Sequence, residues 1–244
     1  MKKLILFSIT LFSLQAFAQE TDPIITDRPT QSASASVMSK GKLLVEAGFV
    51  SENTTNSITN ITFGNLLLRY GVIEGVEIRL TQNYLGRRND ITDFSVNGFS
   101  PLTIGTKVHL LEESGALPQM SIIGQVTLAN GKSAFKLSQV IPEVRLNFTN
   151  TLSDEFSLGY NIGMSLPQAD PTVVYTVVLG YTFAEKWTLF AEPYGSFANS
   201  NVHQFNTGLI YLCSNNVQFD ISAGWGLSNT APDSFIGFGA AIGF

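Results

Sequence analysis

The sequence has little charge: Asp, Glu, Lys and Arg make up only 14% of its 244 residues, against the ~25% usual in soluble globular proteins. The formal net charge is −5, and we find no cluster of Lys and Arg of the kind that binds phosphates. A nucleic-acid partner is therefore excluded. Apolar residues reach 44%, and this balance favours a protein that meets lipid on one side and water on the other.

Cysteine is nearly absent as well. The single Cys213 cannot form an internal disulfide, and no Cys/His pair has metal-ligand spacing. Gly237-Phe238-Gly239 lies in an expected strand, not at a strand-to-helix turn, so it is no dinucleotide loop. We predict neither a metal nor a cofactor.

Long hydrophobic runs are also missing, which excludes a helical membrane span after the N-terminus. The N-terminus itself reads as a signal peptide: Lys2 and Lys3, an apolar stretch from Leu4 to Leu14, and Ala16-Phe17-Ala18 as a cleavage pattern. We predict cleavage after Ala18. Loss of residues 1–18 removes two lysines and no acidic residue, which takes the formal charge from −5 to −7.

What the sequence does contain is strict alternation, the pattern of a strand whose two faces differ. From Val217 to Ser228 every second residue is apolar and the others are small or polar, and Phe156–Leu166 repeats this pattern. The last segment, Ile236–Phe244, carries apolar residues on one face and mostly Gly and Ala on the other. Weaker versions recur near 42–52, 60–72, 75–86, 100–111, 119–129, 135–150, 172–184, 187–198 and 202–214.

These segments predict an all-β fold: a transmembrane, antiparallel, up-and-down β-barrel of about twelve strands over residues 40–244. A tilted strand of ~10 residues spans a ~25 Å apolar band. The links alternate between tight turns and more variable loops, the longest at Arg87–Gly98. Pro142 and Pro193 interrupt expected strands, where proline implies a bulge or an edge. A soluble β-sandwich also alternates, but its water-facing side should be rich in Lys and Glu.

Aromatic residues fall near both ends of the apolar face, as expected for rings at a membrane interface. The partners we predict are the lipids of a bacterial outer membrane and, through the final strand ending at Phe244, the barrel-assembly machinery.

The start of the mature chain resembles a known family. Thr26, Asp27, Arg28 and Pro29 form a T-D-R-P motif, followed by a K-G-x-x-x-x-E-x-G-F strand at 40–49. This order is similar to the MetA-pathway of phenol degradation family of outer-membrane transporters. The family usually has an acidic residue after the proline, where this chain has Thr30. The resemblance implies an outer-membrane barrel with transport activity but does not identify phenol as the solute.

The alternation also predicts which charged residues face inward, since a cation facing lipid at mid-bilayer costs ~2–4 kcal/mol. They include both signs and can form either a salt-bridge lattice that braces the wall or a constriction that selects solutes. The candidates for the lumen or its constriction are Glu46, Arg69, Glu77, Arg79, Lys107, His109, Glu143, Arg145, Glu192 and Asp220. The polar segment 19–39 is either a plug inside the lumen, with Asp27 and Arg28 paired to the wall, or a periplasmic tail.

We therefore predict a passive channel for small solutes, hydrophobic or aromatic ones included, because twelve strands allow a narrow pore. One alternative is a structural or adhesive barrel without transport. Another is a barrel-wall lipid hydrolase, for which only His109 and His203 are available as bases. Neither has a compelling Ser–acid partner in the sequence, so we predict no catalytic residue and no enzymatic activity.

Overall fold

A computed structural model describes residues 22–54, 57–167 and 170–244. The expected signal peptide, residues 1–18, lies outside these ranges, as do residues 19–21 of the polar segment. Within them, no helix is long and apolar enough to span a bilayer. Thirteen strands are present, and their bounds are β1 Leu43–Thr54, β2 Ile58–Ile73, β3 Val76–Asn89, β4 Phe94–Phe99, β5 Thr103–Leu111, β6 Gln119–Thr127, β7 Ile141–Thr151, β8 Phe156–Ser165, β9 Thr172–Ala184, β10 Trp187–Phe197, β11 Val202–Ser214, β12 Val217–Gly226 and β13 Ser234–Gly243.

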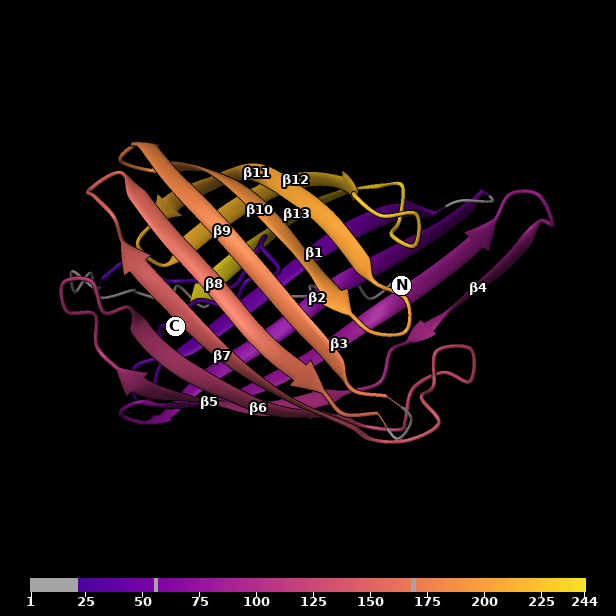
Figure 1. Cartoon of the computed structure of the whole chain (residues 1–244), viewed down its shortest axis with the longest axis horizontal. Helices are drawn as coiled ribbons and strands as arrows, with labels where there is room; N and C mark the ends of the chain where they lie inside the picture. Colours follow the sequence, from indigo (N-terminus) through magenta and orange to yellow (C-terminus); the bar gives the residue numbers. More distant parts are fainter. Residues whose placement is uncertain (1–21, 55–56, 168–169) are drawn as a thin grey trace, which may run out of the picture.

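The strands form one closed antiparallel sheet (Figure 1). Each pairs with its neighbour in the sequence, except that β4 and β5 both pair with β3 and not with each other. Strand β1 pairs with β13 from Leu44↔Gly243 to Asn53↔Ser234, which closes the barrel. The strands β4 and β5 share one position, because β3 pairs with β4 over its outer half and with β5 over its first half. The barrel therefore has twelve strand positions, as predicted from the alternation.

The main departures from the sequence prediction lie at one end. The expected loop Arg87–Gly98 is instead mostly strand: β3 runs to Asn89 and forms with β4 a hairpin that extends beyond the barrel (Figure 1). The expected strand 135–150 begins only at Ile141, because residues 128–140 form the longest link. The strand expected from residue 100 likewise starts at Thr103.

Both prolines lie in strands that are paired on both sides and show no bulge at the proline, so the expectation of a bulge or an edge was wrong. Pro142 pairs with Val126 in regular register. Pro193 pairs with Phe205, and on the β9 side the register is the same before it, at Ala191↔Leu179, as after it, at Tyr194↔Thr176. The ladder loses bridges at the proline, but the strands do not slip.

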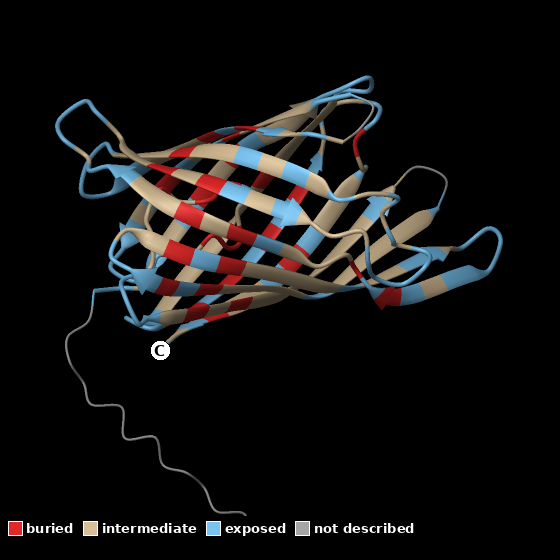
Figure 2. Ribbon diagram, turned by 90° about the horizontal axis from the view of Figure 1, so that it is seen from below, coloured by how far each residue is buried: buried red, intermediate tan, exposed pale blue. Residues whose placement is uncertain are grey.

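Burial is inverted relative to a soluble protein. Among the described residues seven buried side chains are hydrophobic and eighteen are polar or charged, whereas soluble interiors are mainly apolar. On β12, Phe219, Ile221 and Trp225 are 46–51% exposed, while Gln218 and Asp220, the two neighbours of Phe219, are buried. Buried and exposed residues alternate along the strands (Figure 2). This inversion excludes the β-sandwich.

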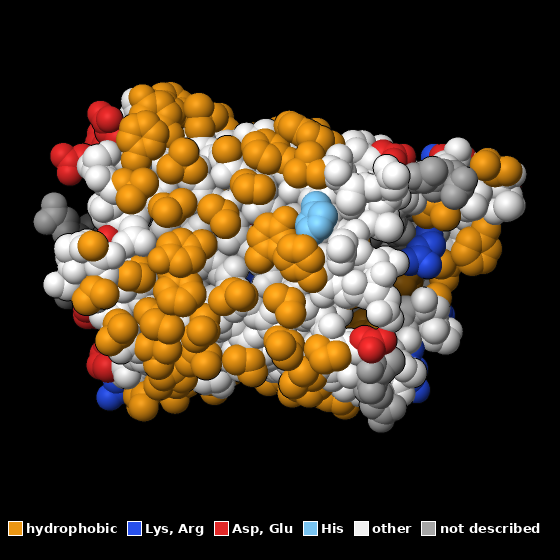
Figure 3. Space-filling model, viewed as in Figure 1, with side chains coloured by type: hydrophobic (Ala, Val, Ile, Leu, Met, Phe, Trp, Pro, Cys, Tyr) orange, Lys and Arg blue, Asp and Glu red, His pale blue; other side chains and the backbone are white. Residues whose placement is uncertain are grey.

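The outer surface matches a bilayer. Hydrophobic side chains cover the middle of the face in Figure 3, and charged side chains gather at its two ends. Near one end Trp187 and Tyr211 lie 4.4 Å apart between ring centroids, and near the other Phe205 and Trp225 lie 5.0 Å apart. These rings form the two aromatic belts expected at the membrane interfaces.

Candidate functional site

Residues 22–39, which we call the luminal segment, lie inside the barrel. The amide of Ile24 donates to the carbonyl of Asn215 (2.7 Å) in the short β11–β12 turn, so the segment enters at the end where the barrel begins and finishes. At the same end, Leu43 and Phe244 exchange backbone hydrogen bonds of 3.1 and 2.8 Å.

The luminal segment winds around the inner wall in the reverse order of the strands. It contacts, in turn, Asp220 on β12, Glu192 on β10, Thr176 on β9, Asn161 on β8, Thr149 on β7, Gln119 on β6, Lys107 on β5 and Glu77 on β3. Further contacts reach Glu46 on β1, Arg69 on β2, Asn206 on β11 and Gly239 on β13. Every one of the twelve strand positions of the barrel thus touches the segment.

Each residue of the T-D-R-P motif has a defined contact. The Thr26 hydroxyl donates to the carbonyl of Arg28 (2.9 Å), which also accepts from the Gln218 amide (3.2 Å). The amides of Asp27 and Arg28 donate to the Glu46 carboxylate at 3.0 and 2.9 Å. Pro29 is buried, and its carbonyl accepts from Asn206. The motif is therefore the part of the segment that is fixed to β1, β11 and β12.

Asp27 and Arg28 point to walls of opposite charge. The Asp27 carboxylate lies 2.7 Å from Arg79 on β3 and 3.6 Å from both Arg69 on β2 and Lys107 on β5. The Arg28 guanidinium makes two hydrogen bonds to Asp220 on β12, at 2.9 and 3.2 Å. Two adjacent residues of the segment thus neutralise two different sides of the lumen.

The cationic wall is also braced within itself. Arg69 donates twice to Glu77, at 3.0 and 3.1 Å, and Arg79 donates to Glu77 at 2.8 Å. Arg69 lies 3.4 Å from Glu46 as well. All four side chains are at least 90% buried, so any one of them left without a partner would be costly.

Burial and the neighbouring cations act in opposite directions on the pKa of the Asp27 carboxyl. Burial alone raises this pKa, but the positive charges of Arg69, Lys107 and Arg79 lower it by more, and the net result is a pKa well below the usual value. Asp27 therefore carries its negative charge at neutral pH, and its ion pairs are lost only as the pH falls through that lowered value.

The acidic residue on the other wall is satisfied by backbone. Glu192 on β10 accepts from the amides of Gln31 and Ser32, the shortest bond being 2.7 Å, and from the Asn206 side chain at 3.0 Å. A buried carboxylate that accepts several N–H bonds needs no cation beside it. The segment's backbone is thus the partner of Glu192.

The remaining sequence candidates lie outside this network or at its edge. Glu143 and Arg145 pair with each other at 2.9 Å, and Arg145 reaches only the carbonyl of Gln31, at 3.3 Å. His109 lies 3.3 Å from Glu112 at the end of β5. The structure therefore brings eight of the ten candidates into contact with the luminal segment, Arg145 through this one bond, and places Glu143 and His109 apart from it.

Sequence reasoning missed the neutral residues that hold the segment. Asn161 both accepts from the Ala33 amide (2.7 Å) and donates to its carbonyl (2.9 Å). Thr176, Asn206 and Gln218 act similarly. The alternation of polar and apolar residues also places these neutral side chains on the inner face, but it does not indicate which of them contact the segment.

Two glycines make room for Arg28 at the seam that closes the barrel. Gly48 on β1 pairs with Gly239 on β13, and a Cβ on either would overlap the Arg28 guanidinium. The Arg28 side chain thus lies against the backbone of Gly48 and Gly239, where no side chains project, and reaches Asp220 on β12. This close approach explains glycine at both positions.

We predict that Gly239→Ala displaces Arg28 from Asp220 and loosens the luminal segment. Limited proteolysis of the purified barrel should then cut within 22–39 at least about tenfold faster, since a loss of 1.4 kcal/mol is tenfold in an opening equilibrium. The matched control is Gly237→Ala, two residues earlier on the same face, where the new Cβ would have its nearest neighbours at 3.2–3.3 Å. Equal cleavage of the two variants would contradict this role of Gly239.

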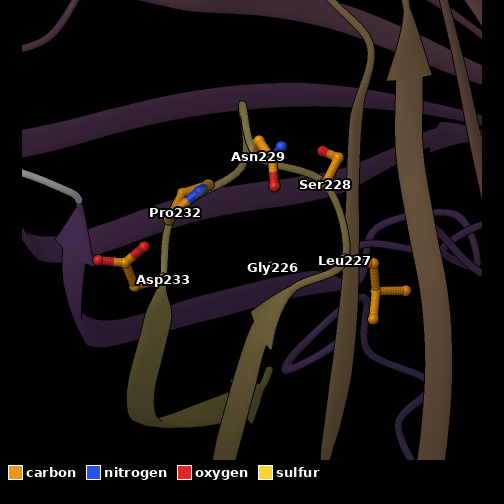
Figure 4. Close-up of a pocket in the computed structure, with 6 residues that line it drawn as sticks. All are labelled: Gly226, Leu227, Ser228, Asn229, Pro232 and Asp233. Atoms are coloured by element: carbon orange, nitrogen blue, oxygen red, sulfur yellow. The ribbon is translucent and has the colours of Figure 1, made fainter.

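A separate pocket lies at the connection between β12 and β13. This pocket of about 510 Å³ is lined by Gly226 at the end of β12 and by Leu227, Ser228, Asn229, Pro232 and Asp233 of the following loop (Figure 4). Asp233 is its one ionisable lining residue. No group of three or more His, Cys, Asp or Glu in the described part of the chain could hold a metal.

Comparison with known proteins agrees with this architecture. The family model described as MetA-pathway of phenol degradation matches residues 26–244, and no curated protein matches the chain. Among solved structures, the KdgM porin superposes with a TM-score of 0.58 at 14% identity, over 82% of this chain and 99% of that chain. The NanC porin gives 0.57 at 9% identity, over 82% and 98%.

A third similar structure is the transport unit of the autotransporter AIDA-I from Escherichia coli, with a TM-score of 0.50 at 8% identity, over 90% of this chain and 92% of that chain. At such identities the likeness concerns the fold. With the apolar belt, the closed twelve-strand barrel is that of a bacterial outer-membrane protein.

Proposed function

This chain belongs to the MetA-pathway of phenol degradation family, and we propose that it is a passive, narrow outer-membrane channel for small solutes, hydrophobic or aromatic ones included. The observation that carries the proposal is the charged, hydrogen-bonding interior of a barrel whose outside is apolar. A barrel that only anchors or braces can be filled by apolar side chains. Buried charges on opposite walls instead suit a path for solutes.

In this proposal residues 22–39 are a plug. The support is that the segment follows the inner wall past all twelve strand positions and bonds to it mainly through polar groups, which water or a solute can replace. Hydrogen bonds and ion pairs exchange for hydration at a small net cost, whereas buried apolar surface does not. The channel is closed while the segment is docked and conducts when it leaves.

Deletion of the plug tests the channel directly. The mature protein lacking residues 22–39 is reconstituted in planar lipid bilayers beside the full-length mature protein. We expect the deletion to raise the mean conductance several-fold, because the segment touches every strand position. A folded deletion variant that neither conducts nor passes solutes into liposomes would contradict the channel.

That negative result would favour the structural or adhesive barrel. One observation supports this second candidate: the segment's bonds to all strand positions would also brace the wall. The two roles separate experimentally, because a brace is measured by stability and a plug by flux.

We propose no enzymatic activity. The His203 ring bonds to the Tyr175 hydroxyl at 3.0 Å, and the His109 ring pairs with Glu112. Among the described residues neither ring has a serine hydroxyl as a hydrogen-bond partner, as a hydrolase of the Ser–His type requires. Lipid hydrolysis that disappears with either histidine would overturn this.

The remaining partner is proposed from the sequence alone. The final strand β13 carries Phe238, Ile242 and, directly after it, Phe244 on its exposed side. We propose that this aromatic end is read by the barrel-assembly machinery.

A further inference from the structure

Three cations on adjacent strand positions converge on one carboxylate. Arg69 on β2, Arg79 on β3 and Lys107 on β5 lie 3.6, 2.7 and 3.6 Å from the carboxylate oxygens of Asp27. The carboxylate also accepts from the amide of Ser34 at 3.0 Å. Of these groups only the three cations belong to the wall. The wall therefore contains a carboxylate-binding site that a residue of the luminal segment occupies.

The charges around this site require an anion. Counted as formal charges, the wall contributes three cationic side chains and, from Glu46 and Glu77, two acidic ones, all of them buried. One positive charge remains, and the Asp27 carboxylate matches it. Without Asp27 the wall would bury an uncompensated charge, which proteins avoid. A lumen that the segment has left would present these three cations to an entering anion.

The site also has donors beyond those that Asp27 uses. The Nε atom of Arg79 is buried and has no hydrogen-bond partner among the described residues. Lys107 and Arg69 donate to the segment's carbonyls at Ser34, Ser36 and Ile25. These donors become available to another ligand when the segment leaves. Arginine in particular matches the two oxygens of a carboxylate.

We infer that Arg69, Arg79 and Lys107 bind the carboxylate group of a small organic solute, and that Asp27 holds this site until the solute displaces it. The inference rests on the proposed channel and names a solute class and a release step for it. Solute and Asp27 cannot occupy the same donors, so binding of one favours undocking of the other. A solute that enters would thereby help to open its own path.

A single carboxylate fits better than a doubly charged phosphate. The site has one positive charge in excess, and a second negative charge would lie close to Glu46 and Glu77, which already face the same cations. Carboxylates that share the same cations repel one another where water is excluded. We therefore commit to monocarboxylates.

A free carboxylate must compete with Asp27, which is tethered to the barrel by the chain. A group on a short linker acts at an effective concentration of about millimolar or more. Free carboxylate must exceed this to displace Asp27 in the wild-type protein. Removing the charge of Asp27 removes the competitor, so the apparent affinity for a free carboxylate should rise.

The test is calorimetric titration of the full-length mature protein in detergent with benzoate, and with benzyl alcohol as the uncharged analogue. We expect Asp27→Asn to lower the half-saturating benzoate concentration at least about tenfold, as for loss of a competitor at millimolar effective concentration. Benzyl alcohol should bind neither protein. Addition of Arg79→Gln to Asp27→Asn should abolish benzoate binding.

The matched control is Arg88→Gln, on the same strand as Arg79 but with a 64% exposed side chain paired to Asp90. It should leave the benzoate titration unchanged. If Asp27→Asn binds benzoate no better than the wild type, or if benzyl alcohol binds equally well, the carboxylate site is wrong.

Conductance separates this inference from the channel itself. Pores that open on deletion of residues 22–39 but take up benzyl alcohol as readily as benzoate would keep the channel and overturn the site. Benzoate binding that depends on Arg79, in a protein that never conducts, would keep the site and overturn the channel.

Discussion

Replacing Asp27 by lysine is expected to raise the mean conductance of the reconstituted barrel at least about tenfold. The new ammonium would lie among Arg69, Arg79 and Lys107, which now surround a carboxylate at 2.7–3.6 Å. Loss of one partner from a buried ion pair costs about 3–5 kcal/mol, and about 1.4 kcal/mol is a factor of ten. The docked state of the segment should therefore become a minority. Single-channel recording in planar bilayers measures the change.

The control for this variant is Asp22→Lys. It makes the same change of charge in the same segment, but Asp22 is exposed. Its conductance should equal that of the wild type. A folded Asp27→Lys barrel that stays as closed as Asp22→Lys would mean that the ion pairs of Asp27 do not hold the segment.

The barrel could be predicted from the sequence because one property, the period of two, determines it. A residue on β12 such as Phe219 or Asp220 faces lipid or lumen according to its parity alone, and each burial class follows from that. The same argument placed Arg69, Arg79 and Lys107 on the inner face. Their mutual distances did not follow, because strand register depends on turns that alternation does not describe.

The β3–β4 hairpin shows where this reasoning ends. Arg87–Gly98 was expected to be a loop because it is polar and contains few apolar residues in alternation. It forms strand because β3 continues past the barrel rim and β4 pairs back on it, from Tyr84↔Phe99 to Asn89↔Phe94. Outside the bilayer both faces of a hairpin meet water. The two faces therefore need not differ in polarity, and the alternation that marks the membrane strands is not required.

The luminal segment was predictable only as an alternative. Its sequence has small and polar residues, which suit a disordered tail as well as a lumen. What distinguishes the two is a set of partners more than 100 residues away, such as Asn161 for Ala33 and Asp220 for Arg28. A single sequence does not reveal such pairs. The T-D-R-P motif was the useful signal, because its residues carry the contacts to Glu46, Asp220 and Arg79.

The network on the cationic wall is expected to be the most stability-critical part of the lumen. Arg69→Gln leaves Glu77 and Glu46 without their main cation, and we expect the free energy of unfolding to fall by about 3–5 kcal/mol. Arg69 is 1% exposed and donates to Glu77, Glu46 and two carbonyls of the segment. Urea titration in detergent, followed by the mobility of the unheated protein on gels, measures the change.

The double variant Arg69→Gln/Glu77→Gln distinguishes a paired network from two independent residues. It removes one charge of each sign, so the charge balance of the wall is restored and the amides can hydrogen-bond to each other. We expect its loss in free energy of unfolding to be smaller than the summed losses of the two single variants. The difference should be about 1–3 kcal/mol, as for residues that share one network. Arg88→Gln, whose ion pair with Asp90 is exposed, should change the stability by at most about 0.5 kcal/mol. If the losses of the two single variants simply add up to that of the double variant, Arg69 acts through its contacts to the luminal segment and not through Glu77. The charge-balance argument for the wall would then fail.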